Sequence, residues 1–252
     1  MRIAIMTDSY LPTIDGVVTA VLVTRKALED MGHTVFILAP DPGDEKYREK
    51  GVYYFRSIEF RSYKGYRVPL FPSDKTEIIR KLHPDVIHIR GIAFMALKGL
   101  MASHNTGIPT VLTYETNVTD VIQQYSPVKL PNEVLVHLAR SYLRGLLARP
   151  TVVTVPSEST RGDLTKLGVE TKDLEVVPTG IDTVHFSRTD DTAIRERYGL
   201  TGKRVIISVG RVSFEKNDSL LVRSMKLMDP DVVLLVCGNG PAMEDLKKIT
   251  AG

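Results

Sequence analysis

Short runs of apolar residues alternate along the 252-residue chain with longer stretches in which apolar residues recur every three or four positions. The longer stretches predict helices, for example over 18–31, 132–147 and 217–228. The short runs are rich in Val and Ile and are bounded by turn-forming residues, so they predict β-strands. The predicted strands are 3–6, 34–39, 52–55, 86–89, 110–113, 151–155, 174–177, 204–209 and 232–237.

Several of these strands are apolar at almost every position, as in "VIISV" and "VVLLVC". Strands of this kind are typical of parallel sheets that helices cover on both faces. Regular alternation of strands and helices then predicts an α/β fold with an open, doubly wound parallel sheet. Ligands of such sheets bind at the carboxyl ends of the strands, so we look for functional residues there.

A domain boundary is expected near "VPTGIDTVHFSRTDD", which is rich in turn formers and has no clear period. We place the N-terminal domain at 1–185 and a second domain at 186–252. The first contains seven predicted strands. The second contains two, fewer than the five or six of an ordinary doubly wound sheet. We therefore expect an incomplete second domain that self-associates through its uncovered apolar strands in 204–252. The alternative is that this region packs loosely against the first domain.

The composition is that of an ordinary globular protein, with 43% hydrophobic and 25% charged residues. The net charge of +3 gives no reason to expect a nucleic-acid partner. The single cysteine, Cys237, excludes an intramolecular disulfide and a multi-cysteine metal site, and we expect it to be buried. No apolar run reaches the roughly 18 residues of a membrane span. The first residues turn polar too soon for a signal peptide, so we expect a cytoplasmic location.

Residues 46–67 combine positive charge with aromatic side chains. They contain seven Lys or Arg, two Glu and seven of the 17 aromatic residues. An anionic membrane surface selects this mixture, and so does stacking on a nucleic acid. The alternative is an ordinary strand and loop whose aromatic residues lie in the core. The candidates for contact with an acceptor or a membrane are Arg61, Tyr63, Lys64, Tyr66 and Arg67.

Two cations follow the predicted strand 204–209. Gly210 ends the strand, Arg211 comes next, and Lys216 lies just before a predicted helix. The N-terminus of a helix already attracts anions, and two added cations repel each other unless an anion joins them. The spacing therefore favours a multiply charged ligand, most simply a diphosphate. The alternative is a surface loop in which Glu215 neutralises one charge.

Glycines also follow other predicted strands. Gly16 stands before the helix after the first strand, where it would let a ligand approach the backbone N–H groups. The alternative for Gly16 is a tight turn. A Gly-x-Gly-x-x-Gly dinucleotide motif is absent after this strand, and "GNGPAM" at 238–243 lacks the third glycine.

His88 and Glu115 are the candidate catalytic residues. His88 and Arg90 project from the same side of the fourth predicted strand, because strand side chains alternate. Glu115 follows the fifth predicted strand, where residues of open α/β sheets reach a ligand. The alternatives are a structural histidine and a solvated loop carboxylate.

Together these stretches resemble the retaining glycosyltransferases of family GT4. The matching segments are "DSYLPTIDGVVTAV", "HPDVIHIRG", "LTYETN", "VPSEST", "VVPTGIDTVHF", "SVGRVSFEKN" and "VCGNGPAMEDL", in the family's order. The resemblance implies the GT-B fold of two facing Rossmann-like domains. It also implies transfer of a sugar from a nucleotide diphosphate sugar with retention and without a metal cofactor.

Particular residues take roles from the resemblance. Arg211 and Lys216 would hold the donor diphosphate, and Gly16, Gly180 and Gly210 would belong to the donor-binding loops. The segments "GYRVP" and "YETNVTDVIQQYSP" are most similar to the branch that glycosylates membrane lipids. This predicts a lipid acceptor and peripheral attachment to the inner face of the membrane.

The chain departs from the family pattern in three places. The family usually has histidine where this chain has Glu115, and a second histidine is common where Arg90 stands. The family's Glu-x7-Glu segment, which grips the donor sugar, would lie beyond Gly252. A non-catalytic homologue that binds a lipid or a partner is therefore the alternative function. A sugar-nucleotide epimerase is disfavoured, because a dinucleotide motif and a Tyr-x-x-x-Lys pair are both missing.

Overall fold

The computed structural model describes residues 1–59, 67–70, 76–115, 131–187 and 189–250. It divides into two compact units, Met1–Asp182 (unit 1) and Thr183–Gly252 (unit 2). The sequence-based boundary at 185 lies three residues beyond this division.

A seven-stranded parallel sheet forms the centre of unit 1, in the order β3-β2-β1-β6-β7-β8-β9. All seven strands were predicted, with ends that differ by at most one residue. The strands are β1 (Arg2–Thr7), β2 (Thr34–Pro40), β3 (Val52–Phe55), β6 (Val86–Arg90), β7 (Thr110–Thr113), β8 (Val152–Val155) and β9 (Leu174–Val176).

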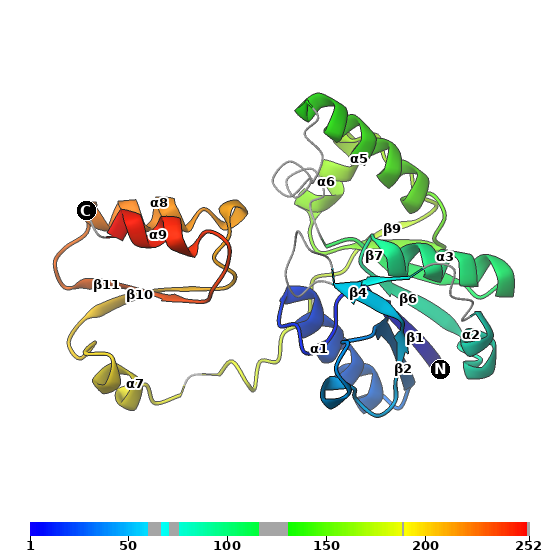
Figure 1. The fold of residues 1–252 in the computed structure, drawn as a ribbon, viewed down its shortest axis with the longest axis horizontal. Coiled ribbons are helices and arrows are strands. Elements are labelled where there is room, and N and C mark those ends of the chain that lie inside the picture. The colour runs from blue at the N-terminus through cyan, green and yellow to red at the C-terminus, as the bar shows by residue number, and fades with distance from the viewer. Residues whose placement is uncertain (60–66, 71–75, 116–130, 188, 251–252) are drawn as a thin grey trace. The chain divides into compact units, whose positions relative to one another are not determined.

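Helices cover both faces of this sheet. From β1 the chain proceeds to β2 in one direction, and from β6 it proceeds through β7 and β8 to β9 in the other. Because crossovers are right-handed, the two directions place their helices on opposite faces, as Figure 1 shows for α1 and α3. The α-helices among the described residues of unit 1 are α1 (Gly16–Asp30), α2 (Thr76–Leu82), α3 (Phe94–Thr106), α5 (Asn132–Leu147) and α6 (Glu158–Lys166).

The core of unit 1 has two parts, one on each face. The larger part joins Met6, Ile89 and Leu112 to helix residues such as Leu143 and Leu164. The smaller part joins strand residues such as Ile5 and Ile37 to Val21 of α1, and all three are fully buried. An antiparallel hairpin of β4 (Ser57–Glu59) and β5 (Arg67–Pro69), which the sequence did not predict, lies outside this sheet.

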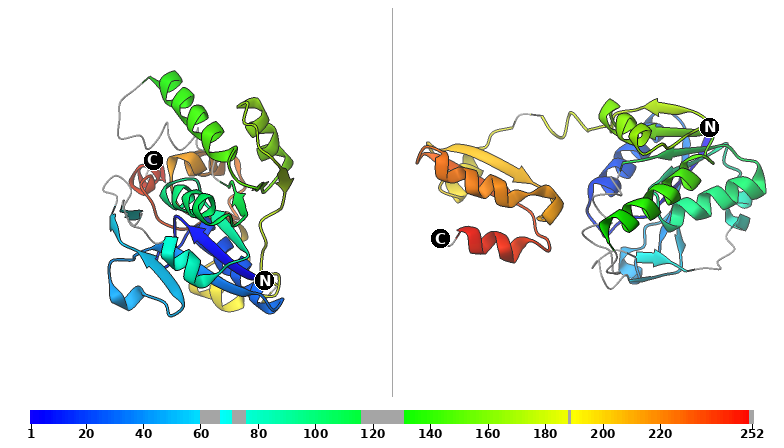
Figure 2. Two further views of the ribbon diagram at one scale, coloured as in Figure 1. Left: turned by 90° about the vertical axis from the view of Figure 1, so that its right-hand side faces the viewer. Right: turned by 90° about the horizontal axis from the view of Figure 1, so that it is seen from above.

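Unit 2 contains two parallel strands, β10 (Arg204–Val209) and β11 (Val232–Cys237), as predicted. Helices α8 and α9 pack against each other (Figures 1 and 2). The hydroxyl of Ser208 on β10 donates a hydrogen bond to Asp218 of α8 over 3.1 Å, so this face of the strands is the covered one. The helices of unit 2 are α7 (Thr192–Arg197), α8 (Asp218–Ser224) and α9 (Met243–Thr250).

The opposite face of the β10–β11 pair is exposed toward its carboxyl end. Ile207 is 58% exposed and Val209 is 74% exposed, and Cys237, which pairs with Val209, is exposed as well. Two predictions were therefore wrong, namely burial of these strands on both faces and burial of Cys237. An apolar run shows that a strand can be buried, but neighbouring elements decide whether it is.

Candidate functional site

The carboxyl end of the sheet in unit 1 brings polar residues together at the point where the strand order changes direction. This point lies between β1 and β6, where the backbone N–H of Asp8 donates to the carbonyl of Arg90 over 3.3 Å. Open α/β sheets bind ligands at such a switch point. The loops after β1, β2, β6 and β7 are therefore where a ligand of unit 1 is expected.

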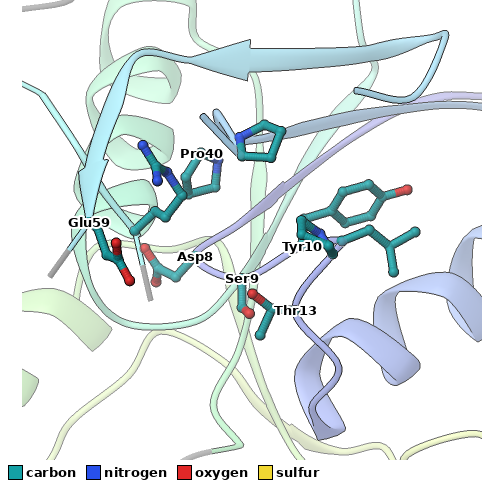
Figure 3. A pocket seen from close by; sticks show the side chains of 10 residues that line it. Asp8, Ser9, Tyr10, Thr13, Pro40 and Glu59 are labelled. Carbon is teal, nitrogen blue, oxygen red and sulfur yellow. The ribbon is translucent and has the colours of Figure 1, made fainter. Parts of the chain in front are cut away.

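A cavity of about 380 Å³ opens beside this point. Figure 3 shows the carboxylates of Asp8 and Glu59 on one side of it and the hydroxyl groups of Ser9 and Thr13 nearby. Such a mixture of acceptors and hydroxyls suits a polyhydroxylated ligand. The cavity is lined by Asp8, Ser9, Tyr10, Leu11, Pro12, Thr13, Pro40, Pro42, Glu59 and Arg67.

Arg67 is positioned by the hairpin. It lies opposite Glu59 in the β4–β5 register, and its Nε donates to the hydroxyl of Ser57 over 2.9 Å. The guanidinium packs on Gly43, where φ is +84° and an added Cβ would lie 2.8 Å from Nη1. Arg67 is thus a cavity residue, and its predicted contact with an acceptor or a membrane stays a prediction.

Asp8 is a buried carboxylate that sequence reasoning missed. Its two oxygens accept hydrogen bonds from the backbone N–H groups of Ala93 (2.8 Å) and Met95 (2.7 Å). The N-cap residue of helix α3 makes no side-chain hydrogen bond, so Asp8 caps the helix from the loop after β1. Burial raises the pKa of Asp8 to about 6, although the backbone donors oppose the shift. The signal was a charged residue directly after a buried strand.

Tyr10 forms another wall of the cavity and is held by a charged network. Its hydroxyl donates to Glu49 over 2.9 Å, and Arg25 of α1 donates to the same carboxylate over 2.7 Å. Burial, followed by the neighbouring Glu49, raises the pKa of Tyr10. The network fixes the ring of Tyr10, which is 4% exposed.

His88 lies farther down β6, among hydroxyl groups. The hydroxyl of Thr154 donates to that of Thr113 over 2.8 Å, and Nε2 of His88 forms a hydrogen bond of 2.7 Å with the same Thr113 hydroxyl. Burial lowers the pKa of His88 to about 3, and the charge of Arg90 acts in the same direction. The ring is therefore neutral at physiological pH, and a catalytic role for His88 stays a prediction.

Arg90 and Glu115 form a buried ion pair at the ends of β6 and β7. Nη2 of Arg90 donates to Oε1 of Glu115 over 2.5 Å, and the two side chains are 7% and 16% exposed. Sequence reasoning considered the two residues separately and missed their contact. Because Glu115 is largely buried and paired with Arg90, it is not the solvated loop carboxylate of the alternative interpretation.

The two glycines of unit 1 with predicted donor roles have no steric need to be glycine among the described residues. Gly16 begins α1 after the N-cap Asp15, and an added Cβ would meet nothing within 4 Å. At Gly180 an added Cβ would meet Val23 at 3.6 Å, an ordinary contact. Their donor-binding roles stay predictions.

In unit 2 the loops after β10 and β11 lie against each other. Gly210 donates to the carbonyl of Cys237 over 3.0 Å, and Val212 to that of Asn239 over 3.1 Å. An added Cβ at Gly238 would lie 1.7 Å from the carbonyl oxygen of Gly210. An added Cβ at Gly240 would lie 2.1 Å from that of Val212. The glycines of "GNG" are thus required by backbone packing.

This packing supports the loop with the two predicted diphosphate ligands. Arg211 is partly buried, whereas Lys216 is exposed at the end of the 3₁₀ turn Phe214–Lys216. Val212 between them is 1% exposed and anchors the loop. Ser213 donates to the carboxylate of Glu215 over 2.5 Å. The loop therefore starts from a fixed backbone at the carboxyl end of a parallel strand.

Acidic residues next to the segment 46–67 lower its local net charge. Residues 41–45 add Asp41, Asp44 and Glu45 and reduce the local net charge from +5 to +2. Arg48 pairs with Asp41 over 2.5 Å and Lys46 with Asp44 over 3.1 Å. The aromatic residues of β3 contribute to the core, as the alternative interpretation expected. Arg61, Tyr63, Lys64 and Tyr66 lie outside the described residues.

Two family models match the chain. Residues 14–185 match Glycosyltransferase Family 4, and residues 190–251 match Glycosyl transferases group 1. The first match covers more than half of the chain.

The chain belongs to glycosyltransferase family 4.

Relatives in this family include two proteins named alpha-monoglucosyldiacylglycerol synthase. The one from Streptococcus pneumoniae is 29% identical over 98% of this chain and 58% of its own length. The one from Acholeplasma laidlawii is 28% identical over 99% of this chain and 66% of its own length. This chain therefore spans about three fifths of the relatives that it matches.

The fold is that of solved GT-B glycosyltransferases. The Anabaena HepE protein, solved in complex with UDP and glucose, matches with a TM-score of 0.69 and 15% identity. The match covers 100% of this chain and 65% of that one. The predicted GT-B fold and the predicted family are thus confirmed.

Among the helices of the described segments, none has both the length and the apolar character needed to cross a bilayer. Within those same segments, no group of three or more His, Cys, Asp or Glu side chains is arranged to hold a metal ion.

Proposed function

We propose that this chain belongs to an enzyme that transfers a sugar, with retention, from a nucleotide diphosphate sugar to an acceptor hydroxyl. The observation that carries the proposal is the loop from Gly210 to Lys216. It presents two cations from a backbone that the 238–242 loop holds in place. Membership of glycosyltransferase family 4 supports the same donor.

In this proposal Arg211 and Lys216 bind the diphosphate and offset the charge that develops on the leaving nucleotide. A guanidinium can fork across two phosphate oxygens, and an ammonium adds a compact charge. We propose that the reaction needs no metal ion. Binding that persists in EDTA is the expected result.

The test of donor binding is calorimetric titration of UDP and GDP into the wild-type chain and into Arg211→Ala and Lys216→Ala. Each variant should weaken binding of the preferred nucleotide about tenfold or more, because charge-assisted hydrogen bonds contribute roughly 1.5–3 kcal/mol each. Lys203→Ala is the control. It removes the same charge at the amino end of β10 and should leave the affinity unchanged. Unaltered affinity in both Arg211→Ala and Lys216→Ala would exclude the diphosphate role.

We propose that the acceptor occupies the cavity of unit 1. The cavity lies at the switch point and offers hydroxyl groups and carboxylates to the hydroxyls of an acceptor. The names of the relatives favour a glycerol-based lipid acceptor. Incorporation of radiolabelled glucose from UDP-glucose into diacylglycerol vesicles is the assay, and labelled water-soluble products alone would argue against a lipid acceptor.

We propose peripheral attachment to an anionic membrane. The support comes from α5, where Val134, Leu138 and Tyr142 are 43%, 51% and 40% exposed at a spacing of four residues. This spacing puts them on one side of the helix, which suits an interfacial position. Leu138→Glu, and separately Arg61, Lys64 and Arg67 all changed to Glu, should reduce co-sedimentation with phosphatidylglycerol vesicles. Leu227→Glu, an exposed apolar residue of unit 2, is the control.

The second candidate function is a non-catalytic binding module. The observation that favours it is the ion pair of Arg90 and Glu115, which occupies positions where the family usually has histidine. Binding of a nucleotide sugar without transfer or hydrolysis would support this function over the enzyme.

A further inference from the structure

Tyr142 connects helix α5 to the segment between β6 and α3. Its hydroxyl donates a hydrogen bond to the carbonyl of Ile92. The next residue of α5, Leu143, is fully buried and fixes the helix on the core. Tyr142 itself is 40% exposed, on the same side of α5 as Val134 and Leu138. Of these three exposed residues, Tyr142 is the one whose side chain can donate a hydrogen bond to a neighbouring loop.

The segment that accepts this hydrogen bond also holds the Asp8 carboxylate. We call residues 91–95 the α3 entry segment. The backbone N–H groups of Ala93 and Met95 donate to Asp8 over 2.8 Å and 2.7 Å. At Gly91 φ is +120°, and an added Cβ would lie 2.3 Å from Oδ2 of Asp8. The α3 entry segment therefore packs directly on the carboxylate, and its position determines how well the backbone donors reach Asp8.

Asp8 is also available to a ligand in the cavity of unit 1. Its carboxylate lies at the wall of this cavity (Figure 3), and the residue is 8% exposed. A carboxylate oxygen carries two lone pairs, so it can accept a second hydrogen bond besides the one from the backbone. A ligand hydroxyl can therefore donate to Asp8 while the α3 entry segment stays in place.

Two opposing effects determine how readily Asp8 accepts a proton. Burial raises its pKa, whereas the backbone donors of the α3 entry segment lower it. Burial and then the nearby charge of Asp8 raise the pKa of Tyr142, so the two side chains interact electrostatically as well. Displacement of the α3 entry segment would weaken the backbone donors and leave the effect of burial unopposed.

We propose that Tyr142 is a positioning residue of the cavity, which holds the α3 entry segment against Asp8 and so keeps this carboxylate charged and able to accept a hydrogen bond from an acceptor hydroxyl. The inference rests on the proposed acceptor site and adds the residue that controls it. A tyrosine with a structural role alone would attach α5 to the rest of unit 1 without affecting Asp8.

The test is the titration of the Asp8 side chain, followed by carbon NMR of the carboxylate between pH 4 and 8. The wild-type chain is compared with Tyr142→Phe, which removes the hydroxyl and keeps the ring. The pKa of Asp8 should rise by about half to one pH unit in this variant, as expected when hydrogen bonds to a charged group are weakened. Tyr198→Phe is the control. It removes the hydroxyl of a tyrosine of unit 2 that is 56% exposed, and it should leave Asp8 unchanged.

The other titratable or charged groups near Asp8 are the same in the three proteins that are compared. They come from the loop after β1, the β4–β5 hairpin, β6 and α3. These groups are Tyr10, Glu59, Arg67, Arg90 and Lys98. Their effects on Asp8 are common to all three titrations, so a difference between wild type and Tyr142→Phe reports on the Tyr142 hydroxyl.

A second measurement connects Asp8 to the acceptor. Dioctanoylglycerol is the probe, and its binding is followed by NMR titration at several pH values. The affinity should fall about fivefold or more as the pH is lowered through the pKa of Asp8, because protonation removes a charge-assisted hydrogen bond. In Tyr142→Phe this fall should begin at a higher pH than in the wild type.

The outcomes have separate meanings. An Asp8 titration that is identical in wild type and Tyr142→Phe would overturn the inference and leave the proposed function standing. An equal rise of the Asp8 pKa in Tyr198→Phe would overturn it as well, because the effect would not depend on the contact with Ile92. Failure of the wild-type chain to bind dioctanoylglycerol at any pH would overturn the glycerol-lipid acceptor of the proposed function, and the titration would still decide the role of Tyr142.

Discussion

Ile5 of unit 1 and Ile207 of unit 2 occupy similar places in parallel strands, but their environments differ. Both lie within runs of apolar residues in their strands, "RIAIMT" and "RVIISV". Ile5 is fully buried, whereas Ile207 is 58% exposed. The same local pattern therefore has two outcomes, and the difference arises from what surrounds each strand.

The neighbours explain the difference. β1 pairs with β2 on one side and β6 on the other, and Ile5 packs in a core with Val21 of α1. Within the described residues of unit 2, β10 pairs with β11 alone, and its covered face is the one that carries Ser208. An apolar run thus encodes the capacity for burial, and the number of partner elements determines how much burial is realised.

The largest expected effect compares these two isoleucines directly. Ile5→Ala should lower the free energy of unfolding by about 2–5 kcal/mol, because it opens a cavity in a closed core. Ile207→Ala should lower it by less than about 1 kcal/mol, because the side chain is already mostly solvated. Urea unfolding followed by circular dichroism measures both. Equal losses would mean that the exposed face of β10 is covered in solution.

Asp8 provides the next effect, which depends on pH. Its pKa is raised from 3.8 to about 6, so the folded state binds a proton more tightly than the unfolded chain. The stability due to this group is fully present below about pH 4 and is lost as the pH rises through about 6, by about 3 kcal/mol in total. In Asp8→Asn this dependence should disappear.

The measurement is the free energy of unfolding of wild type and Asp8→Asn at several pH values between 4 and 7. The difference between the two proteins cancels the other titrating groups. A difference that stays constant across this range would show that Asp8 titrates normally and is not a desolvated cap of α3.

The smallest expected effect concerns the exposed face of β10 and β11. We predict that the chain self-associates through this face, because exposed apolar strands are association sites. Val209→Lys should weaken the association about tenfold or more by placing a charge on a face that would be buried. Light scattering over a range of concentrations measures it. A wild-type chain that remains monomeric at high concentration would contradict the prediction.

Much of the fold could be predicted from the sequence, because it depends on local patterns. Apolar patterns predicted the strands of both parallel sheets. They also predicted the helix Asn132–Leu147. The hairpin of β4 and β5 was not found, because its three-residue strands carry no clear period. The exposure of Val209 was not found either, because it depends on the elements around the strand.

The site could be predicted only in part. Arg211, Lys216 and Glu115 were chosen as candidates because of their positions after apolar strands, and their roles stay predictions. The contact of Arg90 with Glu115 was missed, because it joins residues 25 positions apart and depends on the register of two strands. Gly238 was interpreted as a weak ligand signal, although the backbone of Gly210 explains it. Contacts between strand-end loops are set by the sheet, and local sequence does not specify them.

The central claim is that the loop after β10 binds a nucleotide diphosphate although its strand is only half covered. Hydrogen exchange of backbone amides, with and without saturating UDP or GDP, tests this most directly. Without nucleotide, amides of β10 should exchange faster than those of β1. The preferred nucleotide should slow exchange in 210–217 and 238–242 while leaving β1 and β2 unchanged. Protection confined to residues 1–182, or no protection with either nucleotide, would contradict the account.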